Sequence, residues 1–457
     1  MAVAETDVSL ATLRGDLAAF GDPGEEVRVE RTTGGAVDAS WVQNGRRERA
    51  QVVRGSQPSL IDARVSFNGS ETSYSSFLAG TQMADLKSVA RNTAAVLTSP
   101  RAFVAPEGKY EDRRASADSL VDQLARPALG KTAVVFLTAD AGDGKTTLLK
   151  HLAVERAVSF STGAEERVWL YVDAQGSRLA RLDQALAQAL DEVRAPFPYH
   201  ATESLVRVGA VVLIIDGFDE LIGTTGSYDE AYGSLSAFLQ RLDGNGAVVA
   251  AARSAYYEHE FAARVDRSIG FRTEGWDLRP VRLLDWRLTE RTKYLEKEFE
   301  LQGRTGEVGR ASDALEKVFA DPQLQPLAGK PLFVSRIADL VLSGDPLAGG
   351  TGPLDRLVST YVDREVGKLP SASGPPLLST SLLRDLLSEL AQEMWREEAR
   401  TLSRTTVREL ASLVAELHEL EEDAAAVLVE RLPYLAFLRV GSAPGSVAFE
   451  HELFFAY

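Results

Sequence analysis

The sequence predicts an α/β fold in the middle of the chain, a doubly wound domain built around a parallel sheet. Unbroken apolar runs alternate there with segments of helical periodicity, as expected of strands that are buried on both faces of a sheet. The first run leads directly into a glycine-rich turn and a helix. The runs are Ala133–Leu137, Val168–Val172, Val211–Ile215 and Ala247–Ala252, and the helical segments are Lys145–Val158, Leu179–Val193 and Glu230–Leu242.

The regions on either side of this domain have different patterns. Strand-like stretches with Gly-Gly and Asn-Gly turn signals precede it and indicate a small α+β module, with a helix over Met83–Leu97. After Leu283 the apolar residues recur at helical spacing, and the last helices are followed by a predicted β-hairpin. Helices that close on a hairpin suggest a winged helix.

These patterns divide the chain of 457 residues into four parts. We expect the last part to be incomplete, because the chain stops at Tyr457 directly after an apolar segment. The parts are an N-terminal module of unknown role (1–105), the α/β domain (106–280), a helical domain (281–347) and a winged-helix domain (348–457).

Composition and charge exclude several functional classes. The chain has no cysteine, which excludes disulfides, thiolate metal sites and a cysteine nucleophile and fits a reducing cytosol. No apolar run approaches the roughly 20 residues of a membrane-spanning helix, so we expect a soluble cytoplasmic protein with no membrane partner. A net charge of −16 does not favour nucleic acid as a partner. We interpret the basic cluster Arg46, Arg47, Arg49 and Arg54 as a solvated strand face.

The turn after the first strand has the order and spacing of a phosphate-binding P-loop. Gly142 and Gly144 let backbone N–H groups surround a β-phosphate at the start of a helix. Lys145 would reach the β- and γ-phosphates, and the Thr146 hydroxyl would ligate Mg²⁺. Ala139 departs from the motif, which has glycine at that position. The residues predicted to hold the phosphates are Ala141, Gly142, Asp143, Gly144, Lys145, Thr146 and Thr147.

The third and fourth strands end in charged residues that we expect at the same edge of the sheet as the P-loop. Asp216 would hold the magnesium ion through water. Either Asp219 or Glu220 would orient or deprotonate the attacking water. Arg253 follows the fourth strand and would either sense the γ-phosphate or form a surface ion pair. The residues alone leave both alternatives open.

Together these segments resemble the NACHT branch of the STAND signalling P-loop NTPases. The distinguishing feature is Asp216-Gly217-Phe218-Asp219-Glu220, because most other P-loop ATPases of this broad class have a glutamate where Gly217 stands. The resemblance extends over roughly residues 110–457.

The resemblance also implies contacts outside the P-loop. Gly329-Lys330-Pro331-Leu332 matches the proline motif of the family's helical domain, which implies that Pro331 packs against the adenine. The segment that begins at Phe449 is similar to the winged-helix Phe-x-His-x-x-Phe motif, which implies that His451 contacts the β-phosphate of ADP. Tyr110 and Arg113 occupy the approach segment that borders the adenine in such proteins.

The resemblance implies a molecular switch driven by ATP and ADP with Mg²⁺. In such a switch ADP is held in a closed form, and exchange for ATP opens the protein, promotes self-association and precedes slow hydrolysis. An unknown trigger protein and a role in antiviral defence are implied in the same way. Two alternatives stay open, an AAA+-like motor or loader that acts on nucleic acid and a nucleotide-bound scaffold that does not hydrolyse ATP. The choice of adenine also rests on the lack of an Asn-Lys-x-Asp guanine motif.

Overall fold

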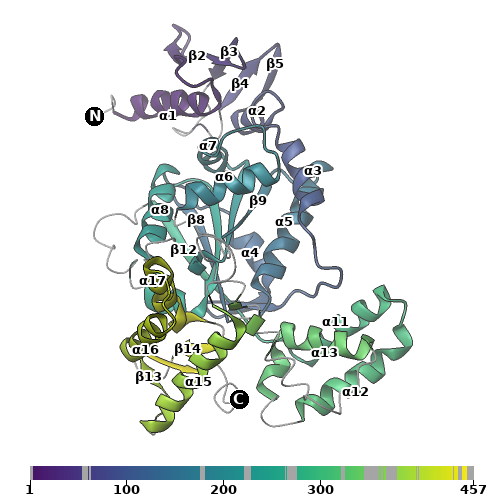
Figure 1. Cartoon of the computed structure of the whole chain (residues 1–457). Helices are drawn as coiled ribbons and strands as arrows, with labels where there is room; N and C mark the ends of the chain where they lie inside the picture. Colours follow the sequence, from purple (N-terminus) through teal and green to yellow (C-terminus); the bar gives the residue numbers. More distant parts are fainter. Residues whose placement is uncertain are drawn as a thin grey trace.

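The computed structural model of the chain consists of a central α/β domain with smaller parts at its two ends (Figure 1). The N-terminal module lies at one end, and the elements that follow the α/β domain lie at the other. The structure describes residues 4–53, 60, 63–140, 142–174, 181–220, 228–262, 264, 275–320, 325–343, 359, 362–363, 365–366, 378–397, 399, 401–435, 437–440 and 445–449.

The central sheet has seven strands in the order β7-β6-β12-β8-β11-β10-β9. The five from β12 to β9 are parallel, whereas β6 and β7 form an antiparallel hairpin on one edge. The strands are β6 (Glu107–Tyr110), β7 (Arg113–Ser116), β8 (Thr132–Ala139), β9 (Val168–Asp173), β10 (Val211–Asp216), β11 (Ala247–Arg253) and β12 (Trp276–Leu283).

The four strands expected from the sequence are confirmed, and so is the α/β fold around a mostly parallel sheet. The antiparallel hairpin on its edge and strand β12 were not expected. Strand β12 was missed because only some of its residues are buried and it contains Asp277, Arg279 and Arg282. Strands β6 and β7 were missed because they are short and polar.

The residues of β8 show why the four strands expected from the sequence have no polar face. All eight are buried, and they alternate between two hydrophobic clusters. Val134 and Phe136 belong to one cluster, and Ala133, Val135 and Leu137 belong to the other. The helices α4 (Ala117–Leu124), α5 (Lys145–Ser161), α6 (Leu182–Glu192), α7 (Ala201–Arg207) and α8 (Tyr228–Arg241) surround the sheet.

The N-terminal module is an antiparallel five-stranded sheet in the order β1-β2-β3-β4-β5. Arg46, Arg47 and Arg49 are exposed on β3, as expected for a solvated strand, and Arg54 lies outside the described residues. The elements are α1 (Ala4–Phe20), β1 (Arg28–Arg31), β2 (Val37–Gln43), β3 (Arg46–Val53), β4 (Arg64–Phe67), β5 (Ser70–Ser73), α2 (Tyr74–Ala79) and α3 (Leu86–Val96).

The module shares one continuous hydrophobic cluster with the α/β domain. Asp16 of α1 is fully buried and pairs with Arg207 of α7. The Tyr74 hydroxyl donates to Asp16 Oδ2 at 2.9 Å. Phe20 packs against Phe197, with ring centroids 6.3 Å apart. The module is therefore packed onto the α/β domain.

After β12 the described residues form a helical part (284–320 and 325–343) and a C-terminal part (the described residues of 359–449). The three-stranded antiparallel sheet of the C-terminal part has the order β13-β15-β14, so the predicted hairpin is confirmed, and the winged helix itself stays a prediction. The elements are α11 (Leu288–Leu301), α12 (Val308–Phe319), α13 (Pro331–Ser343), α15 (Thr380–Arg396), β13 (Leu402–Ser403), α16 (Arg404–Leu417), α17 (Glu422–Arg431), β14 (Leu438–Val440) and β15 (Ser446–Phe449).

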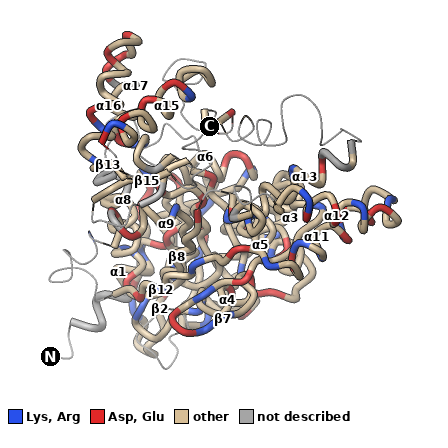
Figure 2. The backbone as a smooth tube through the Cα atoms, turned by 90° about the horizontal axis from the view of Figure 1, so that it is seen from below, with Lys and Arg blue, Asp and Glu red and all other residues tan. Residues whose placement is uncertain are grey.

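Charged residues of both signs are interspersed along the described elements (Figure 2). In that view no single element gathers most of the basic residues. No described helix combines the length and the apolar character that crossing a bilayer requires.

Candidate functional site

The strand order brings the three predicted charged segments to one edge of the sheet. Strand β11 lies between β8, which leads into the P-loop, and β10, which ends at Asp216. Arg253 is in register with Ala139 on β8, and Asp216 is in register with Ala251 on β11. The P-loop, the acidic turn (Asp216 to Glu220) and Arg253 therefore meet at the carboxyl ends of adjacent parallel strands, where ligands bind in open α/β sheets.

The P-loop adopts a backbone conformation that depends on its glycines. Gly142 and Gly144 have φ values of 87° and 91°, a region that side chains with a Cβ rarely adopt. Ala139 is the buried last residue of β8 and does not have a positive φ, so alanine is tolerated there. Lys145 Nζ donates to the carbonyl oxygens of Ala139 and Asp140 at 2.7 and 2.9 Å.

Thr146 and Asp216 form the expected link between the P-loop and β10. The Thr146 hydroxyl hydrogen bonds to Asp216, and the Tyr171 hydroxyl donates to Asp216 Oδ2 at 2.8 Å. Asp216 is 1% exposed, and this burial raises its pKa to about 6 against the lowering effect of the two hydrogen bonds. A hydroxyl beside a carboxylate offers the hard oxygen donors that Mg²⁺ prefers.

The described residues contain no cluster of three or more acidic or histidine side chains that would bind a metal without the nucleotide. Magnesium at a P-loop is held by one or two protein oxygens together with the phosphates and water, so the Thr146–Asp216 pair fits this role.

Arg253 joins the acidic turn to the C-terminal part of the chain. Its Nε lies 3.4 Å from Asp219 Oδ2, and one of its terminal nitrogens donates to Glu365 Oε2 at 2.9 Å. All three side chains are buried, with exposed fractions of 8% for Arg253, 6% for Asp219 and 0% for Glu365. Of the two alternatives for Arg253, the structure rejects an exposed surface ion pair.

The proline motif contacts the P-loop directly. The N–H of Leu332 donates to the Gly142 carbonyl at 3.2 Å. Lys330 Nζ lies 3.0 Å from Asp143 Oδ1. The adjacent Pro331 lines the same cavity as the P-loop. The helical part therefore covers one side of the phosphate site.

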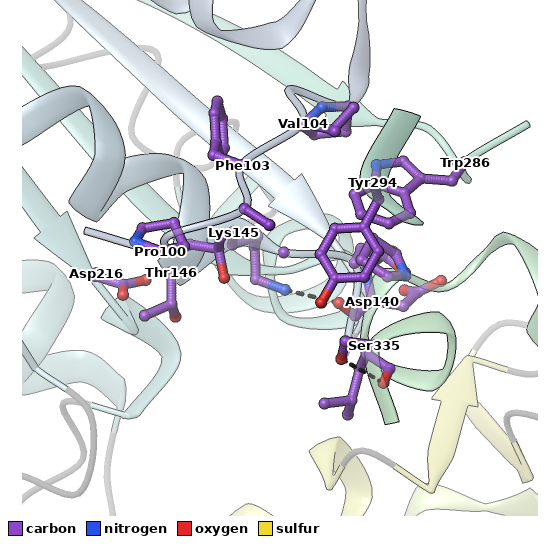
Figure 3. Close-up of a pocket in the computed structure, with 18 of the residues that line it drawn as sticks. Pro100, Phe103, Val104, Asp140, Lys145, Thr146, Asp216, Trp286, Tyr294 and Ser335 are labelled. Carbon is purple, nitrogen blue, oxygen red and sulfur yellow. Dashed lines mark hydrogen bonds between the residues drawn. The ribbon is translucent and has the colours of Figure 1, made fainter. Parts of the chain in front are cut away.

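A cavity of about 470 Å³ unites these groups, and Figure 3 shows its lining. Thr146 and Asp216 lie on one side of it, and Trp286 and Tyr294 lie on the other, with their rings 5.4 Å apart. The lining also includes Gly142, Asp143, Gly144, Lys145, Thr147, Asp219, Arg253, Pro331 and Leu332. The cavity thus has a polar part suited to phosphates and an aromatic part suited to a base.

The wall between these two parts comes from the segment that joins α3 to β6. Pro100, Phe103 and Val104 of this segment line the cavity. The Phe103 ring stacks on the His151 ring of α5, with the ring centroids 3.7 Å apart. Lys297 Nζ of α11 donates to the Phe103 carbonyl oxygen at 2.8 Å. The segment is therefore fixed between the P-loop helix and the helical part.

Two of the predicted site residues are not brought to the cavity. Tyr110 ends β6 and Arg113 begins β7, and neither lines it. Arg113 instead donates to the side chain of Gln123 at 2.8 Å. Tyr110 and Arg113 belong to the polar hairpin at the edge of the sheet. The cavity is lined instead by residues of the preceding segment, Pro100 to Pro106.

Three other predicted residues cannot be placed. Ala141 and His451 lie outside the described residues, and only the backbone of Glu220 is described, in the short helix η2 (Phe218–Glu220). Their roles stay predictions.

Several residues of this site were not expected from the sequence. Tyr171, Trp286 and Tyr294 carried no signal, because aromatic residues near strands and helices are usually core residues. Glu365 lies far from every motif. The position of Lys330 immediately before Pro331 in the proline motif is a signal that could have identified it.

Comparison with known proteins agrees with this geometry. Residues 133–271 match the family model of the NACHT domain, which covers the P-loop, the acidic turn and Arg253. No curated protein is similar in sequence to the chain.

Solved structures of ATPases are similar in part. The Walker-type ATPase PABY2304 of Pyrococcus abyssi has 12% identity and a TM-score of 0.43, covering 78% of this chain and 99% of that one. The ORC2 protein of Aeropyrum pernix, in ADPNP–ADP complexes, has 14% identity and a TM-score of 0.39, covering 78% and 92%. The ORC1 protein of Aeropyrum pernix in complex with DNA has 16% identity and a TM-score of 0.36, covering 79% and 94%.

Proposed function

We propose that this chain, a P-loop NTPase that carries a NACHT domain over residues 133–271, is a molecular switch that distinguishes ATP from ADP. The family match supports nucleotide binding and ATPase activity. The switch, its magnesium dependence and its self-association go beyond that match and are argued from the site.

The observation that carries the proposal is the position of Arg253 between two carboxylates. Arg253 lines the cavity at the tip of β11, next to the P-loop strand. Its guanidinium is engaged by Glu365 of the C-terminal part and by Asp219 of the acidic turn. A γ-phosphate in this cavity offers the same cation a stronger anion, whereas ADP does not. ATP and the C-terminal part therefore compete for Arg253.

The magnitude of this competition is adequate for a switch. Removing one partner of a buried ion pair costs about 3–5 kcal/mol, because the other charge stays buried without compensation. Moving a two-state equilibrium from 1:99 to 99:1 requires about 5.5 kcal/mol of differential binding. The transfer of Arg253 from Glu365 to a phosphate is thus of the right order. A second ion pair, from Arg404 to Glu260 at 2.7 Å, also joins the C-terminal part to the α/β domain and adds to the cost of opening.

The same contacts support the proposal that hydrolysis is slow. Asp219 is a candidate for orienting the attacking water, and in this arrangement its carboxylate faces Arg253 at 3.4 Å. A carboxylate that faces a guanidinium in this way is not oriented toward a water molecule beside the γ-phosphate. Opening would release Asp219, so hydrolysis follows opening and then resets the switch. Magnesium held by Thr146, Asp216 and the phosphates would neutralise charge that develops during the transfer.

We place the adenine against Pro331, Trp286 and Tyr294, with the β-phosphate at the P-loop and Lys145 turning from its carbonyl partners to the phosphates. His451 would contact the β-phosphate of ADP, and displacement of the C-terminal part would expose a surface for self-association. The trigger and a defence role remain expectations from the resemblance.

The nucleotide content of the purified chain tests the proposal. The protein is denatured, and the released nucleotide is separated by chromatography, with Lys145→Ala as the control. Near-stoichiometric ADP in the wild type and its loss in the variant support a resting switch. An empty site with steady ATP turnover that DNA stimulates indicates a motor and overturns the proposal.

A further inference from the structure

Lys330 reaches from the helical part into the phosphate site. Its segment is held in place by the backbone, because the N–H of Trp286 donates to the Gly329 carbonyl at 2.7 Å. A Cβ at Gly329 would lie 2.6 Å from the Cβ of Asp285, so a glycine is required for this close approach. The next residue, Lys330, is 8% exposed.

The partner of Lys330 is Asp143, a carboxylate in the middle of the P-loop. Asp143 is 5% exposed and stands between the two glycines with positive φ. Its Oδ2 accepts the N–H of Asp140 at 2.9 Å, and its Oδ1 accepts Lys330 Nζ at 3.0 Å. Lys330 Nζ also lies 3.8 Å from Asp140 Oδ2.

A buried carboxylate in a phosphate cradle creates an electrostatic problem. The P-loop binds anions through its N–H groups and Lys145, and a second anion among them repels the ligand. Burial raises the pKa of Asp143, and Lys330 and then Lys145 act in the opposite direction. When phosphates bind and Lys145 turns toward them, Lys330 is the cation that continues to face Asp143.

We propose that Lys330 is a positioning residue for the nucleotide, which neutralises Asp143 and so makes the P-loop competent to accept phosphates. Lys330 acts through Asp143 and does not need to touch the nucleotide. Because Lys330 belongs to the helical part, the pair couples occupancy of the site to docking of that part. The inference rests on the proposed nucleotide binding at the P-loop.

The coupling is reciprocal. If the helical part withdraws, Asp143 is left uncompensated beside the phosphates and the affinity for nucleotide falls. By linkage, a bound nucleotide favours the docked helical part by the same factor.

A charge-compensation cycle in the full chain tests the proposal with ADP as the probe. We expect Lys330→Met to weaken ADP binding at least about tenfold, as for loss of one partner of a buried charge pair. Asp143→Asn alone should not weaken binding, because it removes the repelling charge. The double variant should bind ADP nearly as well as the wild type. Lys317→Met, which removes an exposed lysine of α12, is the matched control and should change nothing.

Each other outcome overturns the proposal. Wild-type affinity in Lys330→Met shows that the pair does not position the nucleotide. Equal weakness of Lys330→Met and the double variant shows a purely structural role for Lys330. If Lys330→Met does not fold, the double variant still decides. A folded double variant that binds ADP supports the proposal, and one that neither folds nor binds overturns it.

Failure of the proposed function gives a different result. If the wild type does not bind ADP, or binds it equally well after Lys145→Ala, nucleotide binding at the P-loop is itself wrong. If the wild type binds ADP through Lys145 and the cycle shows no rescue, only the role of Lys330 is wrong.

Discussion

The guanidinium of Arg253, at the tip of β11, donates a hydrogen bond to Glu365 Oε2 at 2.9 Å across 112 residues of sequence. Both side chains are buried, and Asp219 lies 3.4 Å from the same guanidinium. This contact connects the nucleotide cavity with the C-terminal part. Nucleotide bound in the cavity is therefore expected to affect the docking of the C-terminal part, and the docking is expected to affect nucleotide binding.

Replacement of the acidic-turn carboxylates separates a switch from a non-hydrolysing scaffold. If Asp219 or Glu220 orients the attacking water, Asp219→Asn or Glu220→Gln lowers ATP turnover by about 10²–10⁴-fold, the usual contribution of such a group. ADP affinity should be retained in both variants. Single-turnover hydrolysis and equilibrium binding are measured on the same preparations. Full turnover in both variants contradicts the assignment, and a wild type without turnover indicates the scaffold.

The raised pKa of Asp216 predicts a trade-off between stability and metal binding. A carboxyl with a folded-state pKa of about 6 and an unfolded-state pKa near 3.8 binds its proton more tightly in the folded state. The stability that this protonated carboxyl contributes is therefore lost as pH rises from about 4 to about 6. At pH 7.5 the nucleotide-free Asp216→Asn variant should therefore be more stable than the wild type, by at most about 3 kcal/mol.

Thermal unfolding at pH 5 and pH 7.5 measures this difference, which should shrink at the lower pH. The same variant should lose the stabilisation that Mg²⁺ adds to that of ATP alone. A variant that is less stable than the wild type at pH 7.5 would contradict the burial argument.

Unfolding of the N-terminal module should be cooperative with that of the α/β domain, because they share one core and the buried Asp16–Arg207 pair. Arg207→Met leaves Asp16 buried without its cation and should destabilise the chain by about 3–5 kcal/mol. Denaturant unfolding followed by circular dichroism and tryptophan fluorescence measures this. The exposed Arg46→Met is the control and should have little effect. Two separate transitions in the wild type would show that the module is an independent unit.

The aromatic part of the cavity should recognise the base. Tyr294→Ala removes a ring that lies 5.4 Å from Trp286 and should weaken ADP and ATP binding by about tenfold. Binding of inorganic triphosphate, which has no base, should be unaffected. Isothermal titration with both ligands makes the comparison. Equal weakening of both would mean that Tyr294 supports the fold of the site and not the base.

The parts of the site that the sequence predicts are those in which local chain order determines position. The segment from β8 through Gly142 and Gly144 to Lys145 is continuous, so its geometry follows from its own residues. Asp216 and Arg253 end buried parallel strands, and the common edge of such strands brings them together.

The remaining contacts depend on tertiary packing that no local pattern contains. Glu365 meets Arg253 only because the C-terminal part folds back onto the sheet edge. Phe103 lies at the cavity because His151 and Lys297 hold its segment there. The same packing places Tyr110 and Arg113 on a hairpin outside the cavity. Strand β12 was missed because its arginines interrupt the apolar pattern, although β8 pairs with it from Trp276 to Arg282.

The preference of the chain for ATP or ADP is the most direct test of the competition for Arg253. The affinities for ADP and for a non-hydrolysable ATP analogue are measured in the wild type, in Glu365→Gln and in Glu416→Gln, an exposed control on α16. Glu365→Gln removes the competing anion and should raise the affinity for the ATP analogue relative to ADP by at least about tenfold. The control should keep the wild-type ratio. An unchanged ratio in Glu365→Gln would show that the γ-phosphate and the C-terminal part do not compete for Arg253, and the switch would lose its mechanism.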